Sequence, residues 1–267
     1  MMRLALVPAL VALGVTAAGS DAKRGAPVYS AAGLVNAASN EAGVLAPNTL
    51  ATLYGKDLAY ATRAMTPGDI VGGALPFILP GTGLRVSVGS IAAVVYYVSP
   101  GQVNLLIPSL LGPGPADVQV SLNGVTGPAV RVELAEAAPA FFQLSPGWVV
   151  AARPDGSIVG PETPARGGET IVLYATGLGR SIPDPPYGRS PTELARLERL
   201  AELDVLLNGA AVSRESILYA GTAPGFAGLY QINLTLPAAA APNPEIRLRL
   251  GPRISPEGLR LAVAGGE

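Results

Sequence analysis

The side chains capable of chemistry are few in this 267-residue chain, because it contains no histidine and no cysteine. Their absence removes Ser-His-Asp and Cys-His nucleophilic sites, imidazole and thiolate metal sites, disulfides and haem attachment through cysteine. Catalysis would have to depend on carboxylates, hydroxyls, arginine, tyrosine or the two lysines, Lys23 and Lys56. We therefore expect a protein that is not an enzyme and that uses no cofactor.

The most specific polar signal is a repeated pair of amide side chains. Residues 102–108 read QVNLLIP and residues 231–237 read QINLTLP, so the second copy begins 129 residues after the first (231 − 102). In an extended strand, the Gln and Asn of each copy leave the same face about 7 Å apart. The candidate site residues, as structural groups or ligand contacts, are these amides and one tyrosine near each copy: Gln102, Asn104, Gln231, Asn233, Tyr97 and Tyr230.

Two interpretations of the amide pairs are open. An amide donates and accepts hydrogen bonds, so a pair could hold a long loop across the sheet or could bind the hydroxyls of a sugar. The structural interpretation is favoured, because both copies keep the pair in diverged surroundings. Aromatic rings beside the amides would favour sugar binding if they were exposed, but aromatic content is only 5% and most rings are needed for a core. The rings in question are Tyr96, Tyr97, Tyr187, Tyr219, Tyr230 and Trp148.

Carboxylates offer a third and less favoured chemistry. A glycosidase needs two acids across a cleft, roughly 5 to 10 Å apart, whereas acids in connections ordinarily face solvent. The chain has no Asp-x-Asp-x-Asp-Gly calcium loop, so the sequence predicts no metal site. The acids of the second half are Asp155, Glu162, Asp184, Glu193, Glu198, Glu202 and Asp204.

The elements that position these residues are predicted to be short β-strands. The 33 glycines and 26 prolines are spread between apolar runs, which is typical of many strands with tight turns and unfavourable to helices. The fold class is therefore predicted to be all-β, as two tandem immunoglobulin-like sandwiches. Alternating polarity and turn residues predict strands over residues 50–54, 84–88, 93–98, 102–107, 117–122, 129–134, 148–152, 157–159, 170–175, 203–207, 231–236, 246–250 and 259–263.

The duplication predicts how the chain is divided. We expect a signal peptide over residues 1–22, a first sandwich over 23–138 and a second over 139–267. One short helix is predicted in the second unit over residues 190–200, because Ser190 and Pro191 resemble a helix start and leucines follow at helical spacing.

Two long connections rich in glycine and proline are predicted to bind partners. They cover residues 59–83 and 180–191, and neither is expected to be needed for a core.

The amino terminus is typical of an export signal. Arg3 precedes an apolar run over residues 4–15 and a small-residue region over 16–22, and this run is shorter than the roughly 20 residues needed to span a bilayer. The formal net charge is −1 with basic residues scattered singly, which argues against nucleic acid as a partner. We expect a secreted, periplasmic or cell-surface protein with no membrane span after removal of the signal.

Several ordered blocks of the sequence resemble a known family. They are NAAS at 36–39, APNTL at 46–50 with Tyr54-Gly55, YVSPGQVN at 97–104, PARGG at 164–168, YATGLG at 174–179 and APGFAGLYQIN at 223–233. In this order, over residues 36–263, they look like a C-terminal module of exported acidobacterial proteins of unknown function. The resemblance implies tandem immunoglobulin-like domains of the IPT/TIG type and no assigned catalytic residues. The chain has almost nothing before the module, so it looks like a free-standing copy, and the hairpin at 153–160 lacks the expected asparagines.

The favoured function is a secreted, non-catalytic interaction or structural module that binds an extracellular or cell-surface protein. A carbohydrate-binding module is the alternative, and it would require exposed tyrosine or tryptophan on one face with amides beside them. A carboxylate-based hydrolase is the third hypothesis.

Overall fold

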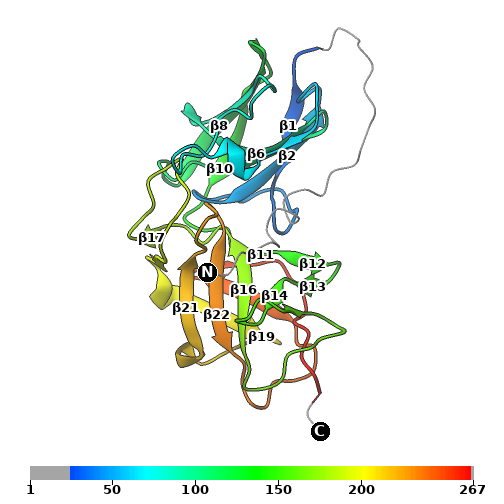
Figure 1. The fold of residues 1–267 in the computed structure, drawn as a ribbon, viewed down its shortest axis with the longest axis vertical. Helices are drawn as coiled ribbons and strands as arrows, with labels where there is room; N and C mark the ends of the chain where they lie inside the picture. The colour runs from blue at the N-terminus through cyan, green and yellow to red at the C-terminus, as the bar shows by residue number, and fades with distance from the viewer. Residues whose placement is uncertain (1–24, 266–267) are drawn as a thin grey trace.

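The structure is a computed structural model that describes residues 25–265, so the expected signal peptide lies outside the described residues. It is all-β, with four principal antiparallel sheets, as the sequence predicts (Figure 1). Strands β1 to β10 form a first unit and strands β11 to β24 form a second unit, and the chain passes from one to the other between Leu134 and Ala140. No helix of the described residues is long and apolar enough to cross a membrane.

The first unit is a sandwich of two sheets. Its larger sheet has the order β1-β2-β7-β6-β3 and its smaller sheet the order β10-β8-β4-β5, with β9 paired to β8. The bounds are β1 (Val28–Asn36), β2 (Leu50–Lys56), β3 (Arg63–Ala64), β4 (Leu84–Val88), β5 (Ile91–Ala92), β6 (Val94–Ser99), β7 (Gln102–Leu106), β8 (Gly114–Leu122), β9 (Val125–Thr126) and β10 (Val130–Leu134), with the 3-10 turn η1 (Pro67–Asp69).

The second unit is a sandwich of the same kind. Its larger sheet has the order β15-β14-β16-β22-β21-β18-β17 with β11 paired to β16, its smaller sheet the order β20-β19-β23-β24, and β12 pairs with β13. The bounds are β11 (Ala140–Phe141), β12 (Gln143–Ser145), β13 (Trp148–Val149), β14 (Ala151–Ala152), β15 (Ile158–Val159), β16 (Thr170–Thr176), β17 (Ser181–Ile182), β18 (Arg196–Leu197), β19 (Leu203–Leu207), β20 (Ala210–Ala211), β21 (Ile217–Thr222), β22 (Tyr230–Thr235), β23 (Ile246–Leu250) and β24 (Arg253–Ile254), with the 3-10 turns η2 (Leu200–Glu202) and η3 (Arg214–Ser216).

The two units repeat one topology. The order β10-β8-β4-β5 in the first unit corresponds to β24-β23-β19-β20 in the second, and the central pair β2–β7 corresponds to β16–β22. The register repeats as well, because Tyr54 lies opposite Gln102 just as Tyr174 lies opposite Gln231. The repeat seen in the sequence is therefore a repeat of strand order and of cross-strand partners.

Each unit has its own apolar core between its two sheets. In β7 and the residue after it, Val103, Leu105 and Ile107 are buried in the first core. In β22, Ile232 and Leu234 are buried in the second. Each fully buried side chain of this size contributes about 1.5–3 kcal/mol, which makes the alternating pattern the main determinant of the register.

The helix predicted over residues 190–200 is wrong. The backbone is extended there, and β18 pairs with β17 and β21, at the same place in the topology that β3 occupies in the first unit. Leu197 is buried in the second core whereas Leu194 is 60% exposed, so the leucines do not form one buried stripe. Pairing with the edge of β21 satisfies the backbone and outweighs the local helical signal.

The strand prediction differs from the structure at further places, among them β21 (Ile217–Thr222), for which no strand was predicted. Residues 259–263 form only isolated bridges, at Arg260 and Val263, instead of a strand. The first strand, β1, was missed because an irregularity between Tyr29 and Leu34 interrupts its pairing with β2 and therefore its alternation.

Candidate functional site

The two units are joined by a third apolar cluster. The outer face of the larger sheet of the first unit, which carries Leu50, Tyr96 and Leu106, packs against residues of the second unit such as Phe142 and Leu229. The complete set of buried members is Ala38, Leu50, Leu75, Val94, Tyr96, Leu106, Ala140, Phe142, Val150, Val172, Tyr174, Ala223 and Leu229. Much of the outer face of the first sheet is therefore covered by the second unit, which explains why β7 is buried along both faces.

Polar groups also cross this junction. The hydroxyl of Thr176 accepts a hydrogen bond across the junction from the backbone N–H of Leu50 at 2.9 Å, and within the second unit it donates to the carbonyl of Gly228 at 2.7 Å. The hydroxyl of Tyr96 donates to the carbonyl of Ala227 at 2.9 Å. Because these groups are buried or half-buried, they would lose hydrogen bonds if the units separated, and they fix how the units meet.

The connections at 59–83 and 180–191, predicted to bind partners, bind each other. The N–H of Leu75 donates to the carbonyl of Gly188 at 2.8 Å, and the N–H of Ser190 donates to Gly73 at 3.0 Å. The hydroxyl of Tyr187 reaches the carbonyl of Ala92 at 2.5 Å. The expectation that the loops are free of the core is wrong, because Leu75 is buried at the junction and Leu79 in the first core.

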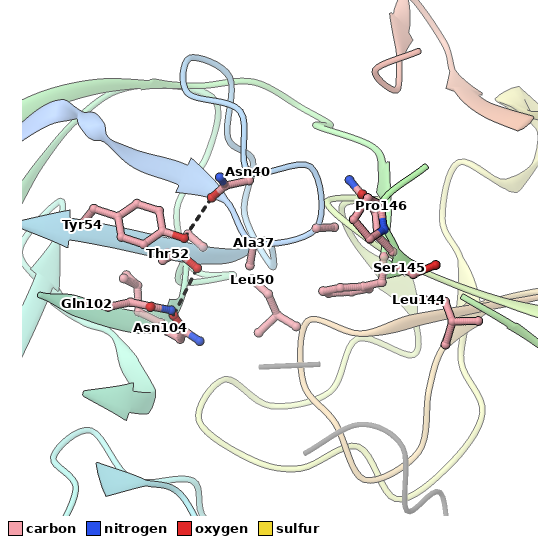
Figure 2. A pocket seen from close by; sticks show the side chains of 15 residues that line it. Ala37, Asn40, Leu50, Thr52, Tyr54, Gln102, Asn104, Leu144, Ser145 and Pro146 are labelled. Atoms are coloured by element: carbon pink, nitrogen blue, oxygen red, sulfur yellow. Dashed lines mark hydrogen bonds between the residues drawn. The ribbon is translucent and has the colours of Figure 1, made fainter. Parts of the chain in front are cut away.

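A groove of about 580 Å³ lies at the junction. One wall is formed by β2, β7 and the turn that follows β1, and the opposite wall by residues 142–146, which include β12 (Figure 2). Leu50 and Ala37 are part of its apolar surface. The lining residues are Ala37, Ala38, Asn40, Leu50, Ala51, Thr52, Tyr54, Gln102, Asn104, Leu105, Phe142, Gln143, Leu144, Ser145 and Pro146, none of which carries a charge.

The first amide pair forms part of this groove. The side-chain N–H of Gln102 donates to Oδ1 of Asn104 at 2.8 Å, and the hydroxyl of Thr52 donates to the same oxygen at 3.1 Å. Figure 2 shows these bonds along one wall. Both amides are buried, and their bonds fix the orientation of the Gln102 amide toward the groove.

Tyr54 stands beside the amides. It lies opposite Gln102 in the pairing of β2 and β7, and its side chain is 41% exposed. Its hydroxyl donates a hydrogen bond to Oδ1 of Asn40 at 3.0 Å (Figure 2). Partial burial raises the pKa of the Tyr54 hydroxyl above its usual range, so the group is neutral at physiological pH. The ring is thus held by a hydrogen bond at its far end while remaining accessible.

The second amide pair has the same bond in other surroundings. The N–H of Gln231 donates to Oδ1 of Asn233 at 2.7 Å, and both side chains are half-buried. Val172 occupies the position opposite Asn233 that Thr52 occupies opposite Asn104. Gln231 and Asn233 are not part of the groove lining.

The two tyrosines among the predicted site residues are buried. Tyr97 lies opposite Asn104 in the pairing of β6 and β7 and is 6% exposed. Tyr230 lies in the second core, where its hydroxyl donates to the carbonyl of Gly179, and burial strongly raises its pKa. Neither ring is exposed enough to stack on a ligand. Of the two roles that the sequence allows for these tyrosines, the structural one fits both.

Carboxylates are absent from the groove lining. Several of those in the second unit pair with arginines: Glu202 pairs with Arg199, and Asp204 with Arg214 and Arg249. The hydrogen bond from Arg199 lowers the pKa of Glu202, and the N–H of Ser157 lowers that of Asp155. Within residues 25–265, no group of three or more acids is arranged to hold a metal ion.

Sequence reasoning found Gln102 and Asn104 but missed most of the groove. Tyr54 belongs to a block noted for the resemblance, whereas Asn40 and Thr52 lie just outside these blocks, and no local pattern places the three residues around one space. Residues 142–146 belong to the other unit and carry no motif at all. The available signal was the cross-strand repeat, since a residue opposite Gln102 must lie beside it on the sheet.

No family model matches the chain, and no curated protein sequence matches it. Among solved structures, the chain is similar to SGBP-B of the Bacteroides ovatus mixed-linkage glucan utilization locus, solved in complex with a mixed-linkage heptasaccharide. The identity is 12% over 83% of this chain and 44% of that chain, with a TM-score of 0.33.

Two further solved structures show comparable similarity. For the surface glycan-binding protein PbSGBP-B from Prevotella bryantii the identity is 11% over 84% of this chain and 40% of that chain, with a TM-score of 0.24. For domains 5-6 of the S-layer protein SbsC the identity is 9% over 90% of this chain and 100% of that chain, with a TM-score of 0.26. The chain spans less than half the length of the two SGBP-B proteins. Such scores assign neither a family nor a ligand. The fold and the site define a tandem immunoglobulin-like protein with a groove at its junction.

Proposed function

We propose that this protein is a non-catalytic extracellular binding module that holds its ligand in the junction groove. The observation that carries the proposal is the groove itself, whose volume of about 580 Å³ lies within the ~300–1,000 Å³ of typical ligand sites. Its walls come from both units, which are joined by buried contacts. A site with walls held in this way is preorganised, which reduces the entropy lost when a ligand binds.

The position outside the cytoplasm is part of the proposal. It is supported by the export signal predicted over residues 1–22 and by the resemblance of residues 36–263 to an exported IPT/TIG-type module. A chain without cysteine can fold in an oxidising compartment without forming incorrect disulfides. Membership of that module family is proposed on the same sequence blocks.

The absence of catalysis is also proposed from the groove chemistry. A hydrolase of the carboxylate type needs one acid with a raised pKa beside a second acid, and the groove lining contains neither. The residues that line the groove are amides, hydroxyls, one tyrosine and apolar groups, which are suited to binding a ligand without reacting with it.

The sequence predicts that a protein partner binds to the connections at 59–83 and 180–191. Since these connections are paired with each other, the groove replaces them as the proposed binding surface for an extracellular protein segment or a glycan.

Blocking the groove tests this function. Ala37 lines the groove and is half-buried, so Ala37→Trp should fill the space, whereas Ala211→Trp adds the same ring to the exposed strand β20. Thermal unfolding is measured with soluble polysaccharides and with extended synthetic peptides. A ligand at 100 times its Kd should stabilise the unmodified chain and Ala211→Trp by about 2.7 kcal/mol, and Ala37→Trp not at all. Equal stabilisation of all three proteins, or of none, would contradict the proposal.

A further inference from the structure

We propose that the ligand of the junction groove is a neutral glycan chain, one sugar ring of which packs on Tyr54 while its hydroxyl groups bind the amides of both walls. This inference rests on the binding function proposed above and adds the chemical class of the ligand. It depends on the charge of the lining, on the exposure of Tyr54, on the position of the amides, and on the place of the groove relative to the sheet.

The lining selects against charged ligands. All fifteen lining residues are uncharged at neutral pH. They include four amide side chains, those of Asn40, Gln102, Asn104 and Gln143. A charged group that enters such a groove loses water without gaining a counter-charge, which is costly. A neutral ligand rich in hydroxyls exchanges hydrogen bonds with water for hydrogen bonds with amides at little cost.

Tyr54 provides the aromatic surface. The apolar C–H face of a sugar ring packs on an aromatic ring, and this requires an accessible ring in a fixed orientation. Tyr54 is 41% exposed, and its hydroxyl is bound to Asn40, so the ring can be covered by a ligand without first being immobilised. The corresponding ring in the second unit, Tyr174, is only 4% exposed.

Amides lie on both sides of the space beside this ring. Gln102 is next to Tyr54 on the first wall, with one side-chain N–H already bound to Asn104. Gln143 and Ser145 line the opposite wall. Because an amide presents donors and an acceptor together, it can bind the paired hydroxyls of a sugar, and two facing walls can bind both edges of the ring.

The wall formed by the first unit argues against an extended protein segment on that side, whereas β12 (Gln143–Ser145) in the opposite wall is paired only with β13. Peptides that add to a sheet need a strand edge with unpaired backbone groups. The wall of the first unit is formed by β2 and β7, and each of these strands is paired on both sides, with β1 and β7 and with β2 and β6. The wall therefore offers side chains instead of a backbone edge, which suits a sugar chain better than a peptide.

Affinity electrophoresis of the full chain tests the inference. The probes are the neutral polysaccharides mixed-linkage β-glucan, galactomannan and arabinoxylan, with polygalacturonate and chitosan as charged probes. At least one neutral polysaccharide should slow migration, and neither charged one should. Tyr54→Ala should raise the Kd for that polysaccharide at least about tenfold, and Tyr54→Phe, which keeps the ring, by less than about threefold.

Tyr60 supplies the matched control, since it is 48% exposed and lies outside the groove lining. Tyr60→Ala should leave binding unchanged, and equal losses in Tyr54→Ala and Tyr60→Ala would overturn the inference. So would retardation by the charged probes that is as strong as by the neutral ones, or no retardation by any neutral probe. If peptides alone stabilise the unmodified chain but not Ala37→Trp, the ligand class is wrong and the binding function stands. If Ala37→Trp changes the binding of no probe, the binding function itself fails.

Discussion

The two copies of the Gln-x-Asn pair share a register and an internal hydrogen bond, but they differ in what surrounds them. In the first unit the pair is buried at the junction, receives a further bond from Thr52 and lies beside the exposed ring of Tyr54. In the second unit it is half-buried, faces Val172 and lies beside the buried ring of Tyr174. The shared register and hydrogen bond explain why both units keep the pair. The different surroundings explain why only the first copy lies in a groove.

This comparison separates a structural role from a binding role. The amide-to-amide bond occurs in both units, so it belongs to the sandwich plan and not to the ligand. The groove lies between the outer face of β2 and β7, beside Tyr54, and residues 142–146 of the second unit. Changes at the junction should therefore affect the first copy far more than the second.

The largest effect is expected from Gly228, which lies against Leu50 and Leu106 of the first unit. A Cβ atom there would lie 2.5 Å from Cδ1 of Leu106 and 3.1 Å from the carbonyl of Asn48, and the backbone has a φ of +82°. Gly228→Ala should destabilise the protein by about 3 kcal/mol through overpacking and left-handed strain together. Denaturant unfolding measures this loss.

Gly209 is the matched control for Gly228. It has a φ of +81°, but a Cβ atom there meets nothing within 4 Å. Gly209→Ala should cost only the strain, about 1–2 kcal/mol. Equal costs for the two variants would mean that the units do not pack at this point.

The next effect compares the two asparagines directly. Asn104→Ala removes the acceptor of both Gln102 and Thr52 at a buried site, and should cost about 2–3 kcal/mol of unfolding free energy. Asn233→Ala removes one bond at a half-buried site, where water can replace the lost partner, and should cost about 1 kcal/mol. Denaturation of both variants under one set of conditions ranks them. A larger loss for Asn233→Ala would show that the second copy is the more constrained.

Sequence patterns predicted the strands and the repeat well, because both follow from local alternation and from turn residues. The bounds of β4, β19 and β23 agree with the prediction to the residue. The side chains of Gln102 and Asn104 leave one face of β7 as expected. What the patterns could not supply was the partner of that outer face, since it comes from residues 140–229 of the other unit.

The errors have the same origin. The signal for a helix at Ser190 is local, but the N–H of Ser190 donates to Gly73 and its hydroxyl is buried without a partner among the described residues. The loops judged free of the core are rich in glycine and proline, and they are bonded to each other through Leu75 and Gly188 and through Ser190 and Gly73. Composition indicates that a segment is irregular, but it does not indicate whether another irregular segment covers it.

Alkaline pH should distinguish the tyrosines opposite the two glutamines. Burial raises the pKa of both Tyr54 and Tyr174, so each stays protonated in the folded chain while the unfolded chain ionises near pH ~10. The stabilisation is complete below that pH and is lost as the pH rises through the folded pKa, with a slope of at most about 1.4 kcal/mol per pH unit for each tyrosine.

The deeper burial of Tyr174 predicts an order for the two variants. Between pH 9 and pH 11, Tyr174→Phe should remove more of the pH dependence of the unfolding free energy than Tyr54→Phe. Denaturant midpoints at several pH values test this order. The reverse order would show that the ring of Tyr54 is the more protected and therefore cannot serve as an open surface.

The smallest effect comes from exchanging the residues opposite the asparagines. Thr52→Val deletes the hydroxyl that donates to Oδ1 of Asn104. It should lower the free energy of unfolding by about 1 kcal/mol, because Gln102 still donates to the same oxygen. Val172→Thr places a hydroxyl opposite Asn233 in the same register, where it can donate to Oδ1 as Thr52 does. We expect this change to be within about 0.5 kcal/mol of neutral, since the new bond offsets the lost apolar contact of Val172. A loss of about 2 kcal/mol in Val172→Thr would mean that the hydroxyl finds no partner, and that the two copies differ in backbone geometry as well as in surroundings.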